Sequence, residues 1–166
     1  TDVFKDVKTG DNTAEVVGKN VDDAYIAAVL EQKMNVEIPK DFKVVYTPIH
    51  GSGNIQVRRI LKEIGAENVL VVAEQEKPDG NFPTVRVPNP ENRDVFDMAI
   101  ELASRENADI IIGTDPDSDR IGVVVKDKDG YFVLNGNQTG TLLAEFILKN
   151  TNPIPEKSKI VKTIVT

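Results

Sequence analysis

Short apolar runs alternate with amphipathic stretches along most of this chain, and that alternation limits the possible folds more than any other feature. Runs rich in β-branched residues at 42–46, 69–73 and 109–113 predict strands. Residues 54–64 and 95–105 carry apolar side chains at helical spacing, and in the first stretch we expect Ile55 and Leu61 to point inward. The order strand, helix, strand, helix, strand is typical of parallel βαβ units, so we expect an open α/β sheet.

Further segments extend this pattern toward both ends of the chain. We expect strands at 121–126 and 131–134, helices at 21–34 and 136–149, and a last strand at 160–165. The first two of these strands flank Asp129-Gly130, a strong hairpin signal that adds antiparallel pairing to the sheet. The prediction is therefore an α/β fold with three layers, α/β/α, around an open, mixed and mostly parallel sheet.

The composition is that of an ordinary globular protein and excludes some partners. The chain has 166 residues, 40% of them hydrophobic and 28% charged. A net charge of −7 argues against nucleic acid or an anionic membrane as a main partner. The sequence has no Cys, no long apolar span and no signal peptide pattern, so we expect a cytoplasmic protein. Because the chain starts without Met and stops inside an apolar run, we interpret it as a fragment.

Three aspartates at alternate positions form the strongest candidate site. Asp115, Asp117 and Asp119 follow the apolar run 110–112 directly, and Arg120 comes next. Converging carboxylates are unfavourable unless a cation neutralises them. Mg²⁺ prefers such oxygen ligands and keeps open positions for water or phosphate, whereas zinc is disfavoured by the lack of Cys and the single His. Arg120 suits a phosphate oxygen, so the sequence predicts a magnesium loop that meets a phosphorylated partner.

Other interpretations of this loop are weaker but differ in what they predict. An EF-hand is rejected because its sixth and twelfth positions hold Arg120 and Lys126 instead of Gly and Glu. A phosphatase of the haloacid-dehalogenase kind would use Asp115 as nucleophile and Asp117 as acid with Mg²⁺, although Asp119 departs from that pattern. A metal-binding or anion-binding module without turnover also stays open, and so does a solvated acidic turn.

A second loop, His50-Gly51-Ser52-Gly53, lies between a predicted strand and a predicted helix. Its backbone N–H groups are a tentative anion site, and a glycine-shaped turn with an exposed His is about equally favoured. A long proline-rich segment at 76–90 is a candidate functional loop. Ligands of open α/β sheets bind beyond the carboxyl ends of the strands, and the two loops around His50 and Asp115 both lie at such ends.

The motif Thr-Asp-Pro-Asp-Ser-Asp-Arg at 114–120 resembles the metal-binding loop of the α-D-phosphohexomutases, the family of phosphoglucomutase and phosphomannomutase, whose pattern is Asp-x-Asp-x-Asp-Arg. Segments 47–53, 82–91 and 134–140 resemble the same family in the same order. The first and last of these segments are most similar to bacterial phosphoglucomutases. The resemblance covers nearly the whole chain after its first 20 residues.

This resemblance implies a four-domain isomerase that moves phosphate between the 1- and 6-positions of a hexose through a hexose bisphosphate. It implies that Asp115, Asp117 and Asp119 hold Mg²⁺ and that Arg120 contacts the phosphate. The family's phosphoserine motif, Ser-His-Asn-Pro, is absent from this sequence. We therefore expect no catalytic nucleophile in this chain and no activity without the other domains of the enzyme.

The resemblance also implies a division of the chain. Residues 1–20 are expected to be a tail or linker, 21–134 the metal-binding second domain, and 135–166 the truncated start of a third domain. The expected partners are a hexose phosphate, a hexose bisphosphate and the other domains of the same enzyme. Neither nucleic acid nor a membrane is expected to bind.

Overall fold

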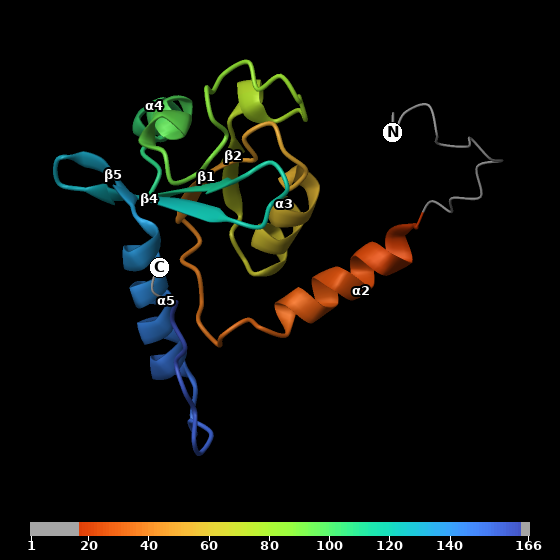
Figure 1. The fold of residues 1–166 in the computed structure, drawn as a ribbon, viewed down its shortest axis with the longest axis vertical. Coiled ribbons are helices and arrows are strands. Elements are labelled where there is room, and N and C mark those ends of the chain that lie inside the picture. The colour runs from red at the N-terminus through yellow and green to blue at the C-terminus, as the bar shows by residue number, and fades with distance from the viewer. Residues whose placement is uncertain (1–16, 164–166) are drawn as a thin grey trace, which may run out of the picture.

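A computed structural model describes residues 17–163 and shows a mixed five-stranded sheet (Figure 1). The strands are β1 (Lys43–Thr47), β2 (Asn68–Val71), β3 (Ile110–Thr114), β4 (Ile121–Asp127) and β5 (Gly130–Leu134). They lie in the order β2-β1-β3-β4-β5. Strand β1 pairs in parallel with β2 and β3, whereas β4 pairs antiparallel with β3 and β5. This topology confirms the predicted open α/β sheet.

Two helices cover opposite faces of the sheet, α3 (Asn54–Glu63) and α4 (Asp97–Glu106) (Figure 1). Successive residues of a strand point to opposite faces, and the core divides accordingly. Val45 of β1 packs in the cluster with Phe96, which ends the short 3₁₀ helix η2 (Arg93–Phe96) before α4. Its neighbour Val44 packs with Leu61 of α3. The predicted three layers, α/β/α, are confirmed.

The elements near the centre of the chain differ little from the predictions. Strand β2 ends at Val71 because a short 3₁₀ helix, η1 (Ala73–Gln75), begins where the prediction continued the strand. Ile55 was predicted to point inward from α3 but is 74% exposed. The face of α3 that meets the sheet instead runs through Val57, Leu61 and Ile64, which have the spacing of one helical stripe.

The first helix of the described chain, α2 (Lys19–Leu30), begins earlier and ends earlier than predicted. Lys19 and Asn20 belong to it instead of the expected tail, whose residues 1–16 lie outside the described part. Its predicted end at Met34 is wrong. The N–H groups of Gln32 and Lys33 donate to carbonyls three residues back, so the last turn is not α-helical. Of the apolar residues in this helix, only Ile26 is buried.

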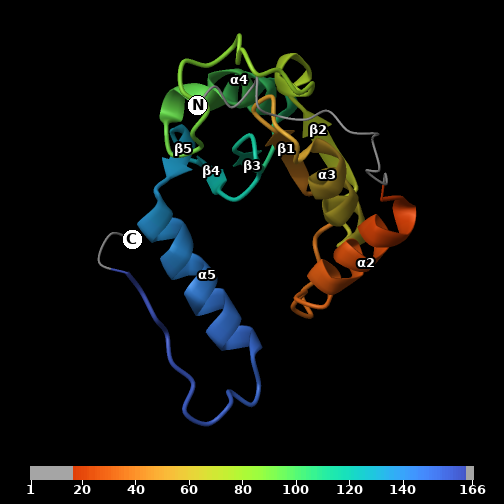
Figure 2. The ribbon, with the colours of Figure 1, turned by 45° about the vertical axis from the view of Figure 1, so that its right-hand side comes forward.

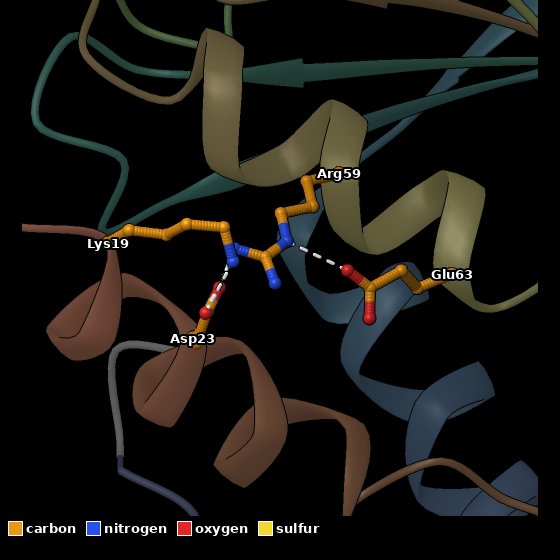
Figure 3. Close-up of polar contacts among 4 residues, drawn as sticks. All are labelled: Lys19, Asp23, Arg59 and Glu63. Carbon is orange, nitrogen blue, oxygen red and sulfur yellow. Dashed lines mark hydrogen bonds and ion pairs between the residues drawn. The ribbon is translucent and has the colours of Figure 1, made fainter.

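Ion pairs attach α2 to α3 (Figure 3). Arg59 Nη1 lies 2.8 Å from Asp23 Oδ1, and its Nε donates to Glu63 Oε1 at 2.7 Å. Lys19 Nζ pairs with the other oxygen of Asp23 at 2.5 Å. Hydrogen bonds from Lys19 and Arg59 lower the pKa of Asp23. Since these side chains are exposed or partly exposed, the pairs contribute little to the stability of the domain.

The last helix, α5 (Gly136–Asn150), extends away from the sheet (Figure 2). It starts with a capping box, in which the Asn135 side chain accepts from the Gln138 backbone and the Gln138 side chain accepts from the Asn135 backbone. No residue of this helix is buried within the described chain.

The predicted strand at 160–165 is not formed over its described residues 160–163, which pair with no neighbouring strand of the sheet. None of the helices in residues 17–163 has the length and apolar character to cross a membrane.

Candidate metal centre

The carboxylate loop begins where β3 ends and turns sharply. Pro116 occupies the second position of this turn, which Pro favours, and the Ser118 N–H closes it by donating to the Asp115 carbonyl at 3.0 Å. Ser118 has a φ of 63°, in the left-handed region, so the chain reverses there. As a result Asp115, Asp117 and Asp119 each offer a carboxylate oxygen, and these oxygens lie within 4.8 Å of one another.

Asp115 is fully buried and is held by Arg120. Its Oδ1 accepts from the Arg120 backbone N–H at 3.0 Å, and its Oδ2 accepts from Arg120 Nε at 2.8 Å. Burial raises the pKa of Asp115, but the backbone and side-chain hydrogen bonds from Arg120 outweigh it, so the pKa lies below its usual value. Asp115 therefore stays ionised, and the Arg120 side chain, 53% exposed, reaches past it toward solvent.

The pKa of Asp119 is shifted in the opposite direction to that of Asp115. A hydrogen bond with Asp115 and the charges of Asp117 and Asp115 raise the pKa of Asp119, although Arg120 Nε lies 3.5 Å from its Oδ1. The three carboxylates therefore repel one another, and a cation between them would remove that repulsion.

The donor set suits magnesium. Oxygens bound to octahedral Mg²⁺ at about 2.1 Å lie about 3 Å apart when adjacent and about 4.2 Å apart when opposite. The three carboxylate oxygens are already within 4.8 Å of one another, and Asp117 and Asp119 are exposed, so their side chains can rotate toward an ion. The residues fit a hard divalent cation with open positions facing solvent.

Without metal, we expect Asp119→Asn to increase the free energy of unfolding at about pH 7, because it removes a carboxylate whose ionisation the folded loop disfavours. The pKa of Asp119 is raised in the folded chain, so this gain is full above that pKa and disappears as the pH falls toward the unfolded value of about 3.9. The lowered pKa of Asp115 acts in the opposite direction, and its stabilising contribution is lost only as the pH falls below about 3.9.

Urea unfolding in a metal chelator, from about pH 7 to about pH 3.5, measures the contributions of Asp119 and Asp115 to the free energy of unfolding. The parent chain and Asp119→Asn should converge in stability as the pH falls. A variant that is less stable than the parent at neutral pH would contradict the expected repulsion.

The second predicted loop, residues 50–53, supports the carboxylate loop from the neighbouring strand. Strands β1 and β3 pair with Thr47 opposite Gly113, so the loops that follow them lie side by side. Both the backbone N–H and the hydroxyl of Ser52 donate to the Pro116 carbonyl, at 2.8 and 3.1 Å. A Cβ on Gly51 would lie 2.4 Å from Pro116 Cα, and one on Gly53 would lie 2.5 Å from Ser118 Oγ. Glycine is therefore needed for this close approach.

The backbone of this loop is already used within the protein, which gives the tentative anion site no support. The N–H groups of His50, Gly51 and Ser52 donate to the carbonyls of Gln75, Pro48 and Pro116. His50 is only 4% exposed, so the alternative of a turn with an exposed His is wrong as well. Its ring contacts the proline-rich loop through Lys77 and Thr84.

The sequence did not predict a buried pair of hydroxyl groups, on Tyr46 and Thr114, beneath the two loops. Tyr46 is fully buried, and its hydroxyl lies 2.9 Å from Thr114 Oγ1 at the end of β3. Burial raises the pKa of Tyr46. Alternation along β1 could have indicated that Tyr46 points inward, but no sequence signal paired it with Thr114.

Together the fold and the site define an α/β/α domain with a candidate divalent-metal loop at the carboxyl edge of its parallel strands. The family described as "Phosphoglucomutase/phosphomannomutase, alpha/beta/alpha domain II" matches residues 23–130. The chain belongs to the phosphoglucomutase/phosphomannomutase family.

Individual relatives agree with this assignment. The chain is 39% identical over 134 residues to the phosphomannomutase of Mycoplasmoides pirum, which covers 81% of this chain and 24% of that protein. It is 39% identical over 144 residues to the phosphoglucomutase of Staphylococcus aureus strain MRSA252, covering 86% of this chain and 26% of that protein. The chain thus spans about a quarter of the length of these curated relatives.

Solved structures give the same result. A phosphoglucomutase/phosphomannomutase family protein from Burkholderia thailandensis superposes with a TM-score of 0.61 and 27% identity, over 78% of this chain and 26% of that one. A phosphomannomutase from Thermus thermophilus, described as putative, has a TM-score of 0.60 at 22% identity over 78% of this chain and 29% of that one, and shows the same fold.

Proposed function

We propose that this chain is the magnesium-binding second domain of a phosphohexomutase and that Asp115, Asp117 and Asp119 are the metal ligands. One observation carries the proposal: three carboxylate oxygens within 4.8 Å of one another at the end of β3, beside an arginine. Membership of the family and the relatives named phosphoglucomutase and phosphomannomutase support it. The boundaries of this domain, 21–134, and of a third-domain segment, 135–166, are part of the proposal.

Each residue of the loop has a separate task in this proposal. Bound Mg²⁺ would supply positive charge that polarises a phosphoryl oxygen and offsets charge that develops during transfer. Asp115 is fixed by Arg120 and provides a rigid ligand, whereas the exposed Asp117 and Asp119 adjust around the ion. Arg120 binds Asp115 through Nε, and its exposed guanidinium is placed to donate to a phosphate oxygen.

The substrate of the complete enzyme is proposed to be a hexose phosphate, with phosphate moved between the 1- and 6-positions through a hexose bisphosphate. The phosphoserine that donates this phosphate would come from another domain, because this sequence has no Ser-His-Asn-Pro motif. This chain therefore supplies half of a catalytic centre, and we propose that it has no mutase activity alone.

A phosphatase with Asp115 as nucleophile is the main alternative, and the geometry disfavours it. A nucleophilic carboxylate must be accessible to the phosphorus atom. Asp115 is fully buried, and each of its oxygens accepts a hydrogen bond from Arg120. A remaining lone pair can still bind a small ion, but a bulky phosphoryl group cannot approach a buried carboxylate in line. A metal-binding module without any catalytic partner is the second alternative, and it predicts the same Mg²⁺ binding as our proposal.

Assays of the chain alone separate the phosphatase from the other two functions. With Mg²⁺, glucose 1-phosphate and a trace of glucose 1,6-bisphosphate, we expect no glucose 6-phosphate and no release of inorganic phosphate. The Staphylococcus aureus phosphoglucomutase serves as the positive control for the assay. Release of phosphate that depends on Mg²⁺ would establish the phosphatase, and clear formation of glucose 6-phosphate would overturn the prediction that the chain is inactive alone.

A further inference from the structure

A chain of buried and partly buried side-chain hydrogen bonds links the end of β1 to the proline-rich loop. Thr47 Oγ1 donates to Gln75 Oε1 at 2.6 Å, and Gln75 Nε2 donates to Thr84 Oγ1 at 3.1 Å. Thr84 Oγ1 lies 2.8 Å from His50 Nε2, and His50 Nδ1 lies 3.2 Å from the Lys77 carbonyl oxygen. His50 is thus the last side chain of this network, and it belongs to the loop that contacts Pro116.

For a neutral His50 ring, the acceptors determine the direction of every bond in the network. A carbonyl oxygen can only accept, so His50 Nδ1 must carry the hydrogen that it donates to Lys77. In the neutral ring Nε2 is then an acceptor, and the Thr84 hydroxyl donates to it. Thr84 Oγ1 in turn accepts from the Gln75 amide, whose oxygen accepts from Thr47. With His50 as the neutral Nδ1–H tautomer, each of these groups is satisfied once in a consistent direction.

The backbone at this point adopts an unfavourable conformation that the network helps to hold. Ile49 has a φ of 46° and His50 a φ of 58°, both left-handed, which is especially costly for the β-branched Ile49. The Ile49 N–H donates to Thr47 Oγ1 at 3.1 Å, so the same network reaches the first strained residue. These two residues turn the chain so that Ser52 meets Pro116.

Pro116 connects this support to the candidate metal site, since it lies between Asp115 and Asp117. Its carbonyl accepts two hydrogen bonds from Ser52, and its Cα is in close contact with Gly51. A change in the turn at His50 therefore moves the backbone of Pro116, which lies between the proposed ligand residues Asp115 and Asp117.

We propose that His50 is a positioning residue, held as the neutral Nδ1–H tautomer by Thr84 and Lys77, which keeps the loop at 50–53 in the one conformation that sets the spacing of the carboxylates. The inference rests on the proposed function as far as metal affinity is concerned. It makes His50 neither a metal ligand nor an anion-binding group.

Two pairs of variants test the network by titration with Mg²⁺. His50→Leu removes both hydrogen bonds of the ring, whereas His50→Gln places an amide oxygen where Nε2 accepts from Thr84. Thr84→Val removes the hydroxyl without a change of shape, and Thr84→Ser restores it. We expect His50→Leu and Thr84→Val to weaken Mg²⁺ binding by about tenfold, the effect typical of groups that support a ligand from behind. His50→Gln and Thr84→Ser should each bind more tightly than their partners.

Nuclear magnetic resonance supplies a measurement that does not depend on affinity. The ring nitrogens of His50 at neutral pH should show the Nδ1–H tautomer, and the amide signals of Asp117 and Ser118 should move in Thr84→Val. An Nε2–H tautomer or a doubly protonated ring would overturn the inference. So would a folded His50→Leu variant with parental Mg²⁺ affinity; if that variant does not fold, Thr84→Val decides.

The two proposals fail in different ways. If the parent chain does not bind Mg²⁺, the proposed function is wrong. The positioning role is then decided by the tautomer of His50 and by the amide shifts of the carboxylate loop, which require no metal.

Discussion

Asp117→Asn is expected to weaken Mg²⁺ binding by this chain by roughly a hundredfold or more, the order expected when a cation loses one adjacent unit charge. Asp117 is exposed, and the loop turn is closed by the backbone of Asp115 and Ser118, so the substitution leaves the fold intact. The side-chain amide keeps the shape but removes the charge. Titration calorimetry of the chain measures the affinity directly.

The same change in a full-length mutase that carries this domain should abolish most of its activity, because the charge that balances the transferring phosphate would be missing. Asp129→Asn, in the exposed turn between β4 and β5, is the matched control and should bind Mg²⁺ like the parent. Parental affinity in Asp117→Asn would remove Asp117 from the ligand set. An equal loss in Asp129→Asn would show that the chain attracts Mg²⁺ only through its overall negative charge.

The sequence contained enough information to predict the fold and the position of the carboxylates. Local patterns located every strand of the sheet, because buried strands need apolar residues and turns need Gly, Pro or Asp. Alternate aspartates directly after a strand predicted a cluster at the end of β3, and their oxygens do converge. The topology rule that sets ligands at the carboxyl ends of parallel strands also placed the two loops together.

The support of the site could not be predicted, because it depends on contacts between distant parts of the chain. The hydrogen bond from Ser52 to Pro116 joins residues 64 positions apart. The sequence showed a glycine-rich turn with a histidine, which is equally compatible with an anion site. Only the structure shows that its amides are used and that His50 is buried. The exposed Ile55 was misplaced for a related reason, since a helix shows its spacing in sequence but not which stripe meets the sheet.

Gly51→Ala is the second change with a large expected effect, because the new Cβ would meet backbone and not a movable side chain. It would lie 2.4 Å from Pro116 Cα and 2.6 Å from the Pro116 oxygen, far closer than real contacts. Neither atom can rotate away, so one of the two loops must shift. We expect a loss of about 1–3 kcal/mol in the free energy of unfolding, typical of overpacking, together with weaker Mg²⁺ binding.

Two glycines provide controls for Gly51→Ala in urea unfolding and Mg²⁺ titration. Gly80→Ala adds a Cβ with no atom within 4 Å and should match the parent in both measurements. Gly53→Ala should lie between them, since its Cβ would meet the ends of the Ser118, Tyr46 and Thr114 side chains. If Gly51→Ala instead retains parental stability and affinity, the contact with Pro116 yields without cost, and the loop at 50–53 cannot be what fixes the carboxylates. A loss of affinity larger than the loss of stability explains would show that this contact serves the metal site itself.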